Sequence, residues 1–433
     1  MLCLNPRQIA VQVLQQYWDG ADYIENLLAN ALQTDALKPA DRRFAQELTY
    51  GVIRWQATLD WLIERKTGHR LQKPIVHILL RLGLYQMFWL DRVPDHAIVD
   101  ESVNLAKRMG CQANAGFLNA VLRGYARERD LTNELLADLK KRHPHLAWSH
   151  PQWLYERWLK RWGPGQTEAL LAWNNSPAVV IARVNSLKTD AARLMELWQQ
   201  ESVTFQPVAC DWAPDNTLFR LDSHPSLKNL PSFIQGYFYI QDASTLLAVR
   251  MLELEAGLRV LDLCAAPGGK TTYIAQQMGN QGQVLACDSD PKRLPLIIEN
   301  CSRLGVTCVQ TSPISVLADG KSATQFDRIL VDAPCSNTGV LRRRIELRWR
   351  LRPEEITRLQ ANQERILEQT ASLLKPGGLL VYSTCSLEPE ENLEVIAHFL
   401  AANPGFKLEG ERTLLPFKEG VDGAYAAQLR RIQ

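Results

Sequence analysis

A short apolar run, a glycine-rich turn and a helical stretch follow one another without a gap from residue 259 to residue 279, and this order constrains the fold more than any other feature. Such a turn between a strand and a helix lets a ligand approach the backbone closely and meets it with the positive end of the helix. The next apolar run, 283–287, is followed by Asp288, an acidic residue at a distance that suits the hydroxyls of a ribose. The pattern predicts two strands with a ribose-containing ligand beside the turn.

Two further apolar runs of strand type, 326–331 and 378–382, alternate with helical stretches such as 353–374. This alternation is typical of an α/β domain with a doubly wound sheet. We therefore expect a Rossmann-like α/β catalytic domain over residues 236–433, with its active site at the carboxyl ends of the strands.

The same turn has to be compared with the phosphate loop of nucleotide hydrolases, which requires Gly-x-x-x-x-Gly-Lys-Ser/Thr. Gly269-Lys270-Thr271 fits the end of that pattern, but Cys264 stands where its first glycine belongs. A P-loop-like NTPase would also leave the polar cysteine sequences further along the chain without a role. It remains an alternative at this point.

Two cysteines lie in polar sequences directly after predicted strands, within Asp332-Ala333-Pro334-Cys335-Ser336 and Ser383-Thr384-Cys385-Ser386. A cysteine taken alone is most often a small buried residue. We expect that of the others outside the turn, which are Cys3, Cys111, Cys210, Cys287, Cys301 and Cys308. Cys335 and Cys385 are candidate nucleophiles, and a thiolate needs a neighbour such as Lys270 to lower its pKa.

The turn and the two cysteine sequences together resemble the RNA cytosine-5 methyltransferases of the Nop2/Sun family. The resemblance implies that Cys385 attacks carbon 6 of a cytosine and that Cys335 serves the release step. It also implies that Asp332 hydrogen-bonds the ring edge, while Lys270 holds the base. The implied cofactor is S-adenosyl-L-methionine, bound by Cys264, Ala265, Ala266, Pro267, Gly268, Gly269, Lys270, Asp288, Ser312 and Asp332.

Ser312 departs from the family pattern, which usually has an aspartate near the adenine amino group. A serine can still accept a hydrogen bond but carries no charge. We expect a lower cofactor affinity or a contact that shifts to the backbone.

The first third of the chain is predicted to be helical, with apolar stripes at helical spacing and with Gly20, Pro39, Pro74 and Pro94 between them. Its sequences around Asp41 to Ala45, Leu80 to Gln86 and Gly116 to Arg123 resemble the NusB RNA-binding fold. This resemblance implies an all-α RNA-binding domain over residues 1–140, with phosphate contacts from Arg42, Arg43 and Arg54.

Residues 145–235 combine tryptophans at near-helical spacing with alternating short strands and helices. The tryptophans are typical of packing rather than of base stacking. The alternation fits linker helices and the small α+β RNA-recognition-like subdomain that the family places before its catalytic domain.

An arginine-rich segment, 342–352, contains six arginines and one glutamate. A solvated surface usually mixes the two signs more evenly. We expect a loop that grips RNA phosphates beside a flipped base, through Arg342, Arg343 and Arg344.

The composition argues against a membrane protein, a metal site and a disulfide framework. With 46% hydrophobic residues and no apolar run of membrane-spanning length, the chain is expected to be cytoplasmic and without a membrane partner. The nine cysteines include no Cys-x-x-Cys pair, so neither a metal nor a disulfide framework is expected. A net charge of +2 means that an RNA partner depends on local basic patches.

The layout of the whole chain is similar to the bacterial branch of the Nop2/Sun family that acts on small-subunit (16S) ribosomal RNA. We therefore expect a monomeric methyltransferase that forms 5-methylcytosine in that RNA. A non-catalytic RNA-binding or ribosome assembly factor is a further alternative, and the presence of both cysteines argues against it. Equilibrium binding of ATP against S-adenosylmethionine would distinguish the NTPase.

Overall fold

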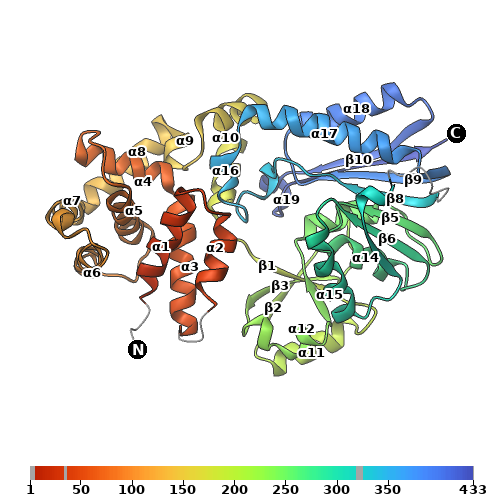
Figure 1. Cartoon of the computed structure of the whole chain (residues 1–433), viewed down its shortest axis with the longest axis horizontal. Coiled ribbons are helices and arrows are strands. Elements are labelled where there is room, and N and C mark those ends of the chain that lie inside the picture. Colours follow the sequence, from red (N-terminus) through yellow and green to blue (C-terminus); the bar gives the residue numbers. More distant parts are fainter. Residues whose placement is uncertain (1–4, 34–36, 318–324, 433) are drawn as a thin grey trace. The chain divides into compact units, whose positions relative to one another are not determined.

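The chain was analysed as a computed structural model, which describes residues 5–33, 37–317 and 325–432 (Figure 1). The chain forms two compact units, Met1–Ser176 with Arg344–Arg350 and Pro177–Arg343 with Leu351–Gln433. We call the first the helical unit and the second the sheet unit. The segment Arg344–Arg350 therefore belongs to the helical unit, although its sequence lies within that of the sheet unit.

The described part of the helical unit is built from helices. They are α1 (Pro6–Trp18), α2 (Ile24–Ala31), α3 (Pro39–Arg54), α4 (Gln56–Thr67), α5 (Pro74–Trp89), α6 (Asp95–Arg108), α7 (Ala115–Arg127), α8 (Arg129–Arg142), α9 (Pro144–Ala147), α10 (Gln152–Asn175) and α16 (Leu347–Arg350), with the 3-10 turn Gln112–Asn114. Prolines open α1, α3 and α5, where the missing N–H leaves no intrahelical bond unmade.

Helix α5 forms the centre of this unit and is buried along most of its length. The apolar faces of α1, α3, α4, α6 and α7 pack into the same core. Of the tryptophans that follow, Trp158 is fully buried and Trp148, Trp153 and Trp162 are half-buried, as expected for packing. The expected all-α class of the first domain is confirmed.

The sheet unit begins with a small antiparallel sheet whose strand order is β2-β3-β1-β4. Its elements are β1 (Val180–Val184), α11 (Ala191–Gln200), β2 (Thr204–Val208), β3 (Leu218–Ser223), α12 (Pro231–Ile234) and β4 (Phe238–Ile240), with the 3-10 turn Leu227–Asn229. Trp198 of α11 is fully buried against Phe205, Phe219 and Phe238. The expected α+β subdomain is confirmed.

The larger sheet has seven strands in the order β10-β11-β9-β8-β5-β6-β7. The strands are β5 (Arg259–Leu263), β6 (Gln283–Asp288), β7 (Val309–Pro313), β8 (Phe326–Asp332), β9 (Leu374–Thr384), β10 (Phe406–Leu414) and β11 (Ala424–Arg431). Strands β5 to β9 pair in parallel, whereas β11 pairs antiparallel with β9 and β10. The helices are α13 (Leu246–Arg250), α14 (Gly269–Gln277), α15 (Leu294–Leu304), α17 (Pro353–Ala371), α18 (Leu393–Ala402) and α19 (Pro416–Glu419), and the 3-10 turns are Ala243–Thr245, Pro291–Arg293, Ile314–Leu317, Thr338–Val340 and Pro389–Glu391.

Helices cover both faces of this sheet (Figure 1). Val260, Leu330 and Val381 face the core that contains α13 and α14, while their strand neighbours face the core that contains α17 and α18. The alternation follows from the two-residue period of a strand, and the apolar runs supply buried residues to both faces. The doubly wound α/β class is thereby confirmed, and the carboxyl ends of β5, β6, β8 and β9 meet at one edge.

Candidate active site at the carboxyl edge of the sheet

The glycine-rich turn leads from β5 into α14 in a tightly fixed conformation. Cys264 has a left-handed backbone with φ of 59°, and Gly268 has φ of 99°. A Cβ on Gly268 would lie 3.2 Å from the Cα of Ile297. Glycine is therefore required there both for its backbone conformation and for the close approach to α15.

Asp288 at the end of β6 holds this turn from the side. Its Oδ2 accepts a hydrogen bond from the backbone N–H of Ala266 at 3.1 Å, and the carboxylate is almost fully buried. Asp262 lies beneath the turn and accepts a hydrogen bond from the Thr271 hydroxyl at 2.6 Å. Burial raises the pKa of Asp262 to about 7.

The chemistry of the turn fits a nucleoside linked to an amino acid. The first N–H groups of a helix lack intrahelical partners, and those of α14 begin at Gly269, so they can bind a carboxylate. Burial, followed by the charges of Asp332 and Asp288, raises the pKa of Cys264 to about 12. Cys264 therefore stays a neutral thiol and lines the turn without acting as a nucleophile.

Ser312 lies on β7 and pairs in register with Cys287 of β6. This position is at the same edge of the sheet as the turn. The serine is half-buried, and its hydroxyl points to the carbonyl of Pro313 at 3.4 Å.

An ion pair joins the turn to the end of β8. The Nζ of Lys270 lies 2.6 Å from Oδ2 of Asp332, and Oδ1 of Asp332 accepts a hydrogen bond from the Ser383 hydroxyl at 2.8 Å. Burial disfavours the charge on Lys270, but Asp332 and then Cys385 favour it, so the pKa of Lys270 is raised. A stable positive charge thus acts on Cys385.

The two candidate nucleophiles lie side by side. The sulfurs of Cys335 and Cys385 are 3.3 Å apart, and the Cys385 thiol points to Oδ1 of Asn337 at 3.1 Å. The hydrogen bond with Cys385, burial and the charge of Glu391 raise the pKa of Cys335 well above its usual value. The raised pKa favours the protonated form of Cys335, and the neighbouring sulfur of Cys385 interacts electrostatically with Lys270.

Gly339 allows the loop after Cys335 to lie against the strand end that carries Cys385. Its N–H donates to the carbonyl of Cys385 at 2.9 Å, and a Cβ there would lie 2.7 Å from that oxygen.

Sequence reasoning missed Asn337, Gly339 and Glu391. The acidic run after Cys385 was visible, but nothing in it indicated that Glu391 turns back toward both cysteines.

Comparisons with known proteins assign the chain to one family. A model of the 16S rRNA methyltransferase RsmB/F family matches residues 249–430, a NusB family model matches residues 4–127, and a ferredoxin-like domain model from RsmF/B-like methyltransferases matches residues 150–216. A probable ribosomal RNA small subunit methyltransferase B from Synechocystis is 35% identical, covering 99% of this chain and 100% of the relative. The ribosomal RNA small subunit methyltransferase B of Vibrio vulnificus is 35% identical, covering 98% and 99%.

The chain belongs to the ribosomal RNA small subunit methyltransferase B family. A solved structure, a methyltransferase homolog protein from Pyrococcus horikoshii, is 33% identical with a TM-score of 0.58, covering 66% of this chain and 97% of that one. This membership supports the methyltransferase and leaves the NTPase alternative without support.

Two arginines at the start of the segment 342–352 are bound to carboxylates of the protein itself. Arg342 has 4% of its surface exposed and forms ion pairs with Asp422 at 2.5 Å and with Asp242 at 3.3 Å. Arg343 binds the same two carboxylates, at 2.8 Å in the case of Asp242. In this structure the guanidinium of Arg342 is buried and bound to two carboxylates, and its contact with a phosphate stays a prediction.

Residues Arg344–Arg350 of the segment belong to the helical unit. Arg348 is fully buried and donates to the carbonyls of Ser149 and Asn174 and to Oδ1 of Asn175, at 3.2, 2.9 and 2.7 Å. The indole N–H of Trp349 donates to the carbonyl of Ile53 at 2.9 Å. Arg344 is exposed, and its contact with RNA stays a prediction.

The three arginines predicted to bind RNA from the helical unit differ in their surroundings. Arg42 donates to the carbonyls of Leu32 and Leu37 at 2.7 and 3.3 Å. Arg43 is exposed and Arg54 is half-buried. Their phosphate contacts stay predictions.

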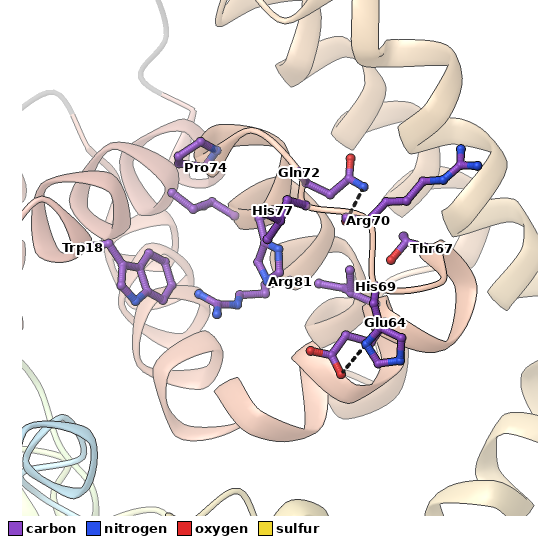
Figure 2. A pocket seen from close by; sticks show the side chains of 12 residues that line it. Trp18, Glu64, Thr67, His69, Arg70, Gln72, Pro74, His77 and Arg81 are labelled. Atoms are coloured by element: carbon purple, nitrogen blue, oxygen red, sulfur yellow. Dashed lines mark hydrogen bonds and ion pairs between the residues drawn. The ribbon is translucent and has the colours of Figure 1, made fainter.

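The helical unit also contains a hollow of about 360 Å³ between the end of α1, α4 and α5 (Figure 2). Arg81 lies over the Trp18 ring at 4.4 Å, and both line the hollow together with His77. Asp60 beneath them accepts hydrogen bonds from Arg81 and His77 at 2.6 and 2.7 Å. None of the arginines predicted to bind RNA lines this hollow.

Among the described residues, no group of three or more histidine, cysteine or acidic side chains could hold a metal ion. No helix in the described ranges is long and apolar enough to cross a membrane. Cys111, Cys287 and Cys301 are buried, Cys210 and Cys308 are half-buried, and Cys3 lies outside the described ranges.

Proposed function

We propose that this protein transfers a methyl group from S-adenosyl-L-methionine to carbon 5 of a cytosine in small-subunit (16S) ribosomal RNA. The single observation that carries the proposal is the pair of thiols, 3.3 Å apart, beside a lysine at the carboxyl edge of the sheet. Carbon 5 of cytosine is a poor nucleophile, and a thiolate that adds to carbon 6 makes the ring enamine-like. The names of the relatives support the choice of RNA.

The cofactor site follows from the turn. Asp288 would hold the ribose hydroxyls, the N-terminus of α14 would meet the methionine carboxylate, and Ser312 would lie near the adenine. When bound, S-adenosylmethionine supplies an electrophilic methyl group. Its positive sulfonium charge would add to that of Lys270 on the side of the site that carries the attacking sulfur.

Cys385 carries the attack. Its thiolate would bond to carbon 6 and move the ring electrons to carbon 5, so that carbon 5 could take the methyl group and the sulfonium would be left as the neutral thioether S-adenosylhomocysteine. Asp332 would hold the ring edge, and its ion pair with Lys270 fixes both side chains at this position. A base then removes the proton from carbon 5, the bond between carbon 6 and sulfur breaks, and Cys385 leaves as a thiolate.

Cys335 serves the release step, in which the proton leaves carbon 5 and the bond between carbon 6 and sulfur breaks. Its hydrogen bond with Cys385 is the largest cause of its raised pKa. Once Cys385 is a thioether to carbon 6, its sulfur carries no negative charge and accepts a hydrogen bond only weakly, so the hydrogen bond is weakened and the smaller contribution of the Cys385 charge is removed. The pKa of Cys335 then falls, so its thiol becomes available as a base, or as a relay to one, only after attack has occurred.

The test is methylation of small-subunit ribosomal RNA by the purified protein with S-adenosylmethionine, followed by nuclease digestion and mass spectrometry of the nucleosides. The proposal expects 5-methylcytidine at one position. A methyl group on nitrogen 4 of cytidine, on ribose or on another base would overturn it. A preparation of Cys385→Ala serves as the control for contaminating activity.

A further inference from the structure

Glu391 is a buried carboxylate at the centre of the two cysteine sequences. It lies at the end of the 3-10 turn after β9 and has no exposed surface. Its Oε1 accepts a hydrogen bond from the backbone N–H of Ser336 at 2.8 Å, and its Oε2 accepts from the hydroxyls of both Ser336 and Ser386. Gln363 of α17 donates to Oε1 at 3.1 Å.

The two serines are the immediate neighbours of the two reactive cysteines. Ser336 follows Cys335, Ser386 follows Cys385, and their hydroxyl oxygens lie 3.0 Å apart. One carboxylate thus binds the residue next to each sulfur. Charge-assisted hydrogen bonds of this kind are short and roughly twice as strong as neutral ones.

Glu391 is itself fixed by β9. The Tyr382 hydroxyl donates to its backbone carbonyl at 2.7 Å. The next residue, Asn392, accepts from the Thr384 hydroxyl at 2.6 Å and donates to the carbonyl of Ser386 at 2.9 Å. The carboxylate therefore cannot shift without disturbing the strand that carries Cys385.

We propose that Glu391 is a positioning residue. It holds Cys385 and Cys335 at the separation at which Cys335 can serve the release step after Cys385 has attacked. It acts through Ser336 and Ser386 and does not touch the substrate. This inference rests on the proposed function for its catalytic consequences, whereas the positioning itself can be measured without RNA. A displacement of about 1 Å at a reacting atom costs on the order of a hundredfold in rate.

Three variants separate positioning from simple stability. Glu391→Ala removes all the acceptors, whereas Glu391→Gln keeps one oxygen and the shape. Asp327→Asn is the matched control, because Asp327 also bridges strands, from the opposite end of β8. It accepts from the N–H of Arg259 at 2.8 Å and pairs with Lys375 at 2.6 Å.

The first measurement is the rate at which diamide closes a disulfide between Cys335 and Cys385. Two thiols lose two hydrogens, diamide is reduced to the hydrazine, and the product is identified by peptide mass spectrometry. Glu391→Ala should slow closure by about tenfold or more, with Glu391→Gln between it and the unchanged Asp327→Asn. Closure at the wild-type rate in Glu391→Ala would overturn the proposal whatever the substrate of the enzyme is.

The second measurement is turnover on RNA. Glu391→Ala should lower kcat by about a hundredfold and leave KM for S-adenosylmethionine unchanged. Glu391→Gln, which keeps one acceptor oxygen, should have a kcat between those of Glu391→Ala and the wild type. Equal losses in Asp327→Asn would mean that Glu391 only stabilises the sheet. If Glu391→Ala does not fold, Ser336→Ala and Ser386→Ala test the same contacts one at a time, and wild-type closure and turnover in both would overturn the proposal.

Discussion

The carboxyl edge of the sheet and the arginine-rich segment 342–352 are both dense in conspicuous residues, yet only one of them presents its side chains as the sequence suggests. At the edge, Lys270, Asp332, Cys335 and Cys385 come together in one cluster. In the segment, most of the described arginines are occupied by the protein itself. Arg342 and Arg343 bind carboxylates, and Arg348 is fully buried.

The difference lies in what fixes each residue. Parallel strands that pair in register place the residues after their ends at one edge, so the sequence pattern alone sets their approximate positions. A run of charges has no such constraint. Whether an arginine meets solvent, a carboxylate or a carbonyl depends on partners far away in the sequence, such as Asp242 and Asp422.

The largest expected effect concerns Cys385. Cys385→Ala should lower methyl transfer by about 10⁴-fold or more, because the attack on carbon 6 needs this sulfur, while binding of S-adenosylmethionine is unchanged. Isothermal titration measures the binding and tritium transfer measures the rate. Turnover at the wild-type rate would mean that Cys385 at the carboxyl edge does not carry the attack. The sequence would then have misled at the edge as well as in the arginine-rich segment.

Cys335→Ala should fail in the opposite way. The variant should form the bond to carbon 6 and accept the methyl group, then stall before elimination. Denaturing electrophoresis with labelled RNA should show a slow covalent species that is absent in the double variant Cys335→Ala/Cys385→Ala. If the species appeared with Cys385→Ala alone, the two roles would have to be exchanged, since an adduct lasts only while the attacking sulfur is present.

Arg348 tests the segment on the side of stability. Arg348→Met should destabilise the helical unit by about 2–4 kcal/mol, because it leaves the carbonyls of Ser149 and Asn174 buried without their donor, although a buried charge is removed as well. Calorimetry should show the unfolding transition of the helical unit at a lower temperature, with that of the sheet unit unchanged. The control is the exposed Arg344→Met, which should leave both unfolding transitions at their wild-type temperatures. A wild-type scan for Arg348→Met would contradict the structural role.

Sequence patterns were sufficient for β5, β6, β8 and β9 and for the glycine-rich turn and the placement of the cysteines after strands, since each depends on local order and on a two-residue or helical period. They did not predict β10 and β11 of the same sheet. They were insufficient for Glu391, which acts by folding back onto Ser336 across more than fifty positions. They were also insufficient for Arg344–Arg350, a segment that leaves one unit and folds with the other. Contacts of this length depend on tertiary packing, which no local pattern records.

The edge also predicts a pH effect with a defined direction. Because Cys385 is the largest cause of the raised pKa of Cys335, Cys385→Ala should lower that pKa, and alkylation of Cys335 by iodoacetamide should begin at a lower pH than in the wild type. Glu391→Gln should move it in the same direction by less. An alkylation profile that does not shift in Cys385→Ala would mean that the two sulfurs do not interact.

The smallest expected effect concerns the exposed arginine of the segment. If Arg344 contacts a phosphate, Arg344→Ala should weaken RNA binding about equally for cognate and unrelated RNA and reduce the slope of log K against log salt by about one. Fluorescence anisotropy over a range of salt concentrations measures this slope.

Arg342→Ala is the matched comparison. Replacing a buried arginine that pairs with Asp422 should lower the stability of the protein and leave the salt slope unchanged as long as the protein stays folded. Equal changes of slope in both variants would restore the whole segment as a phosphate-binding loop and would show that the ion pairs with Asp242 and Asp422 open when RNA binds.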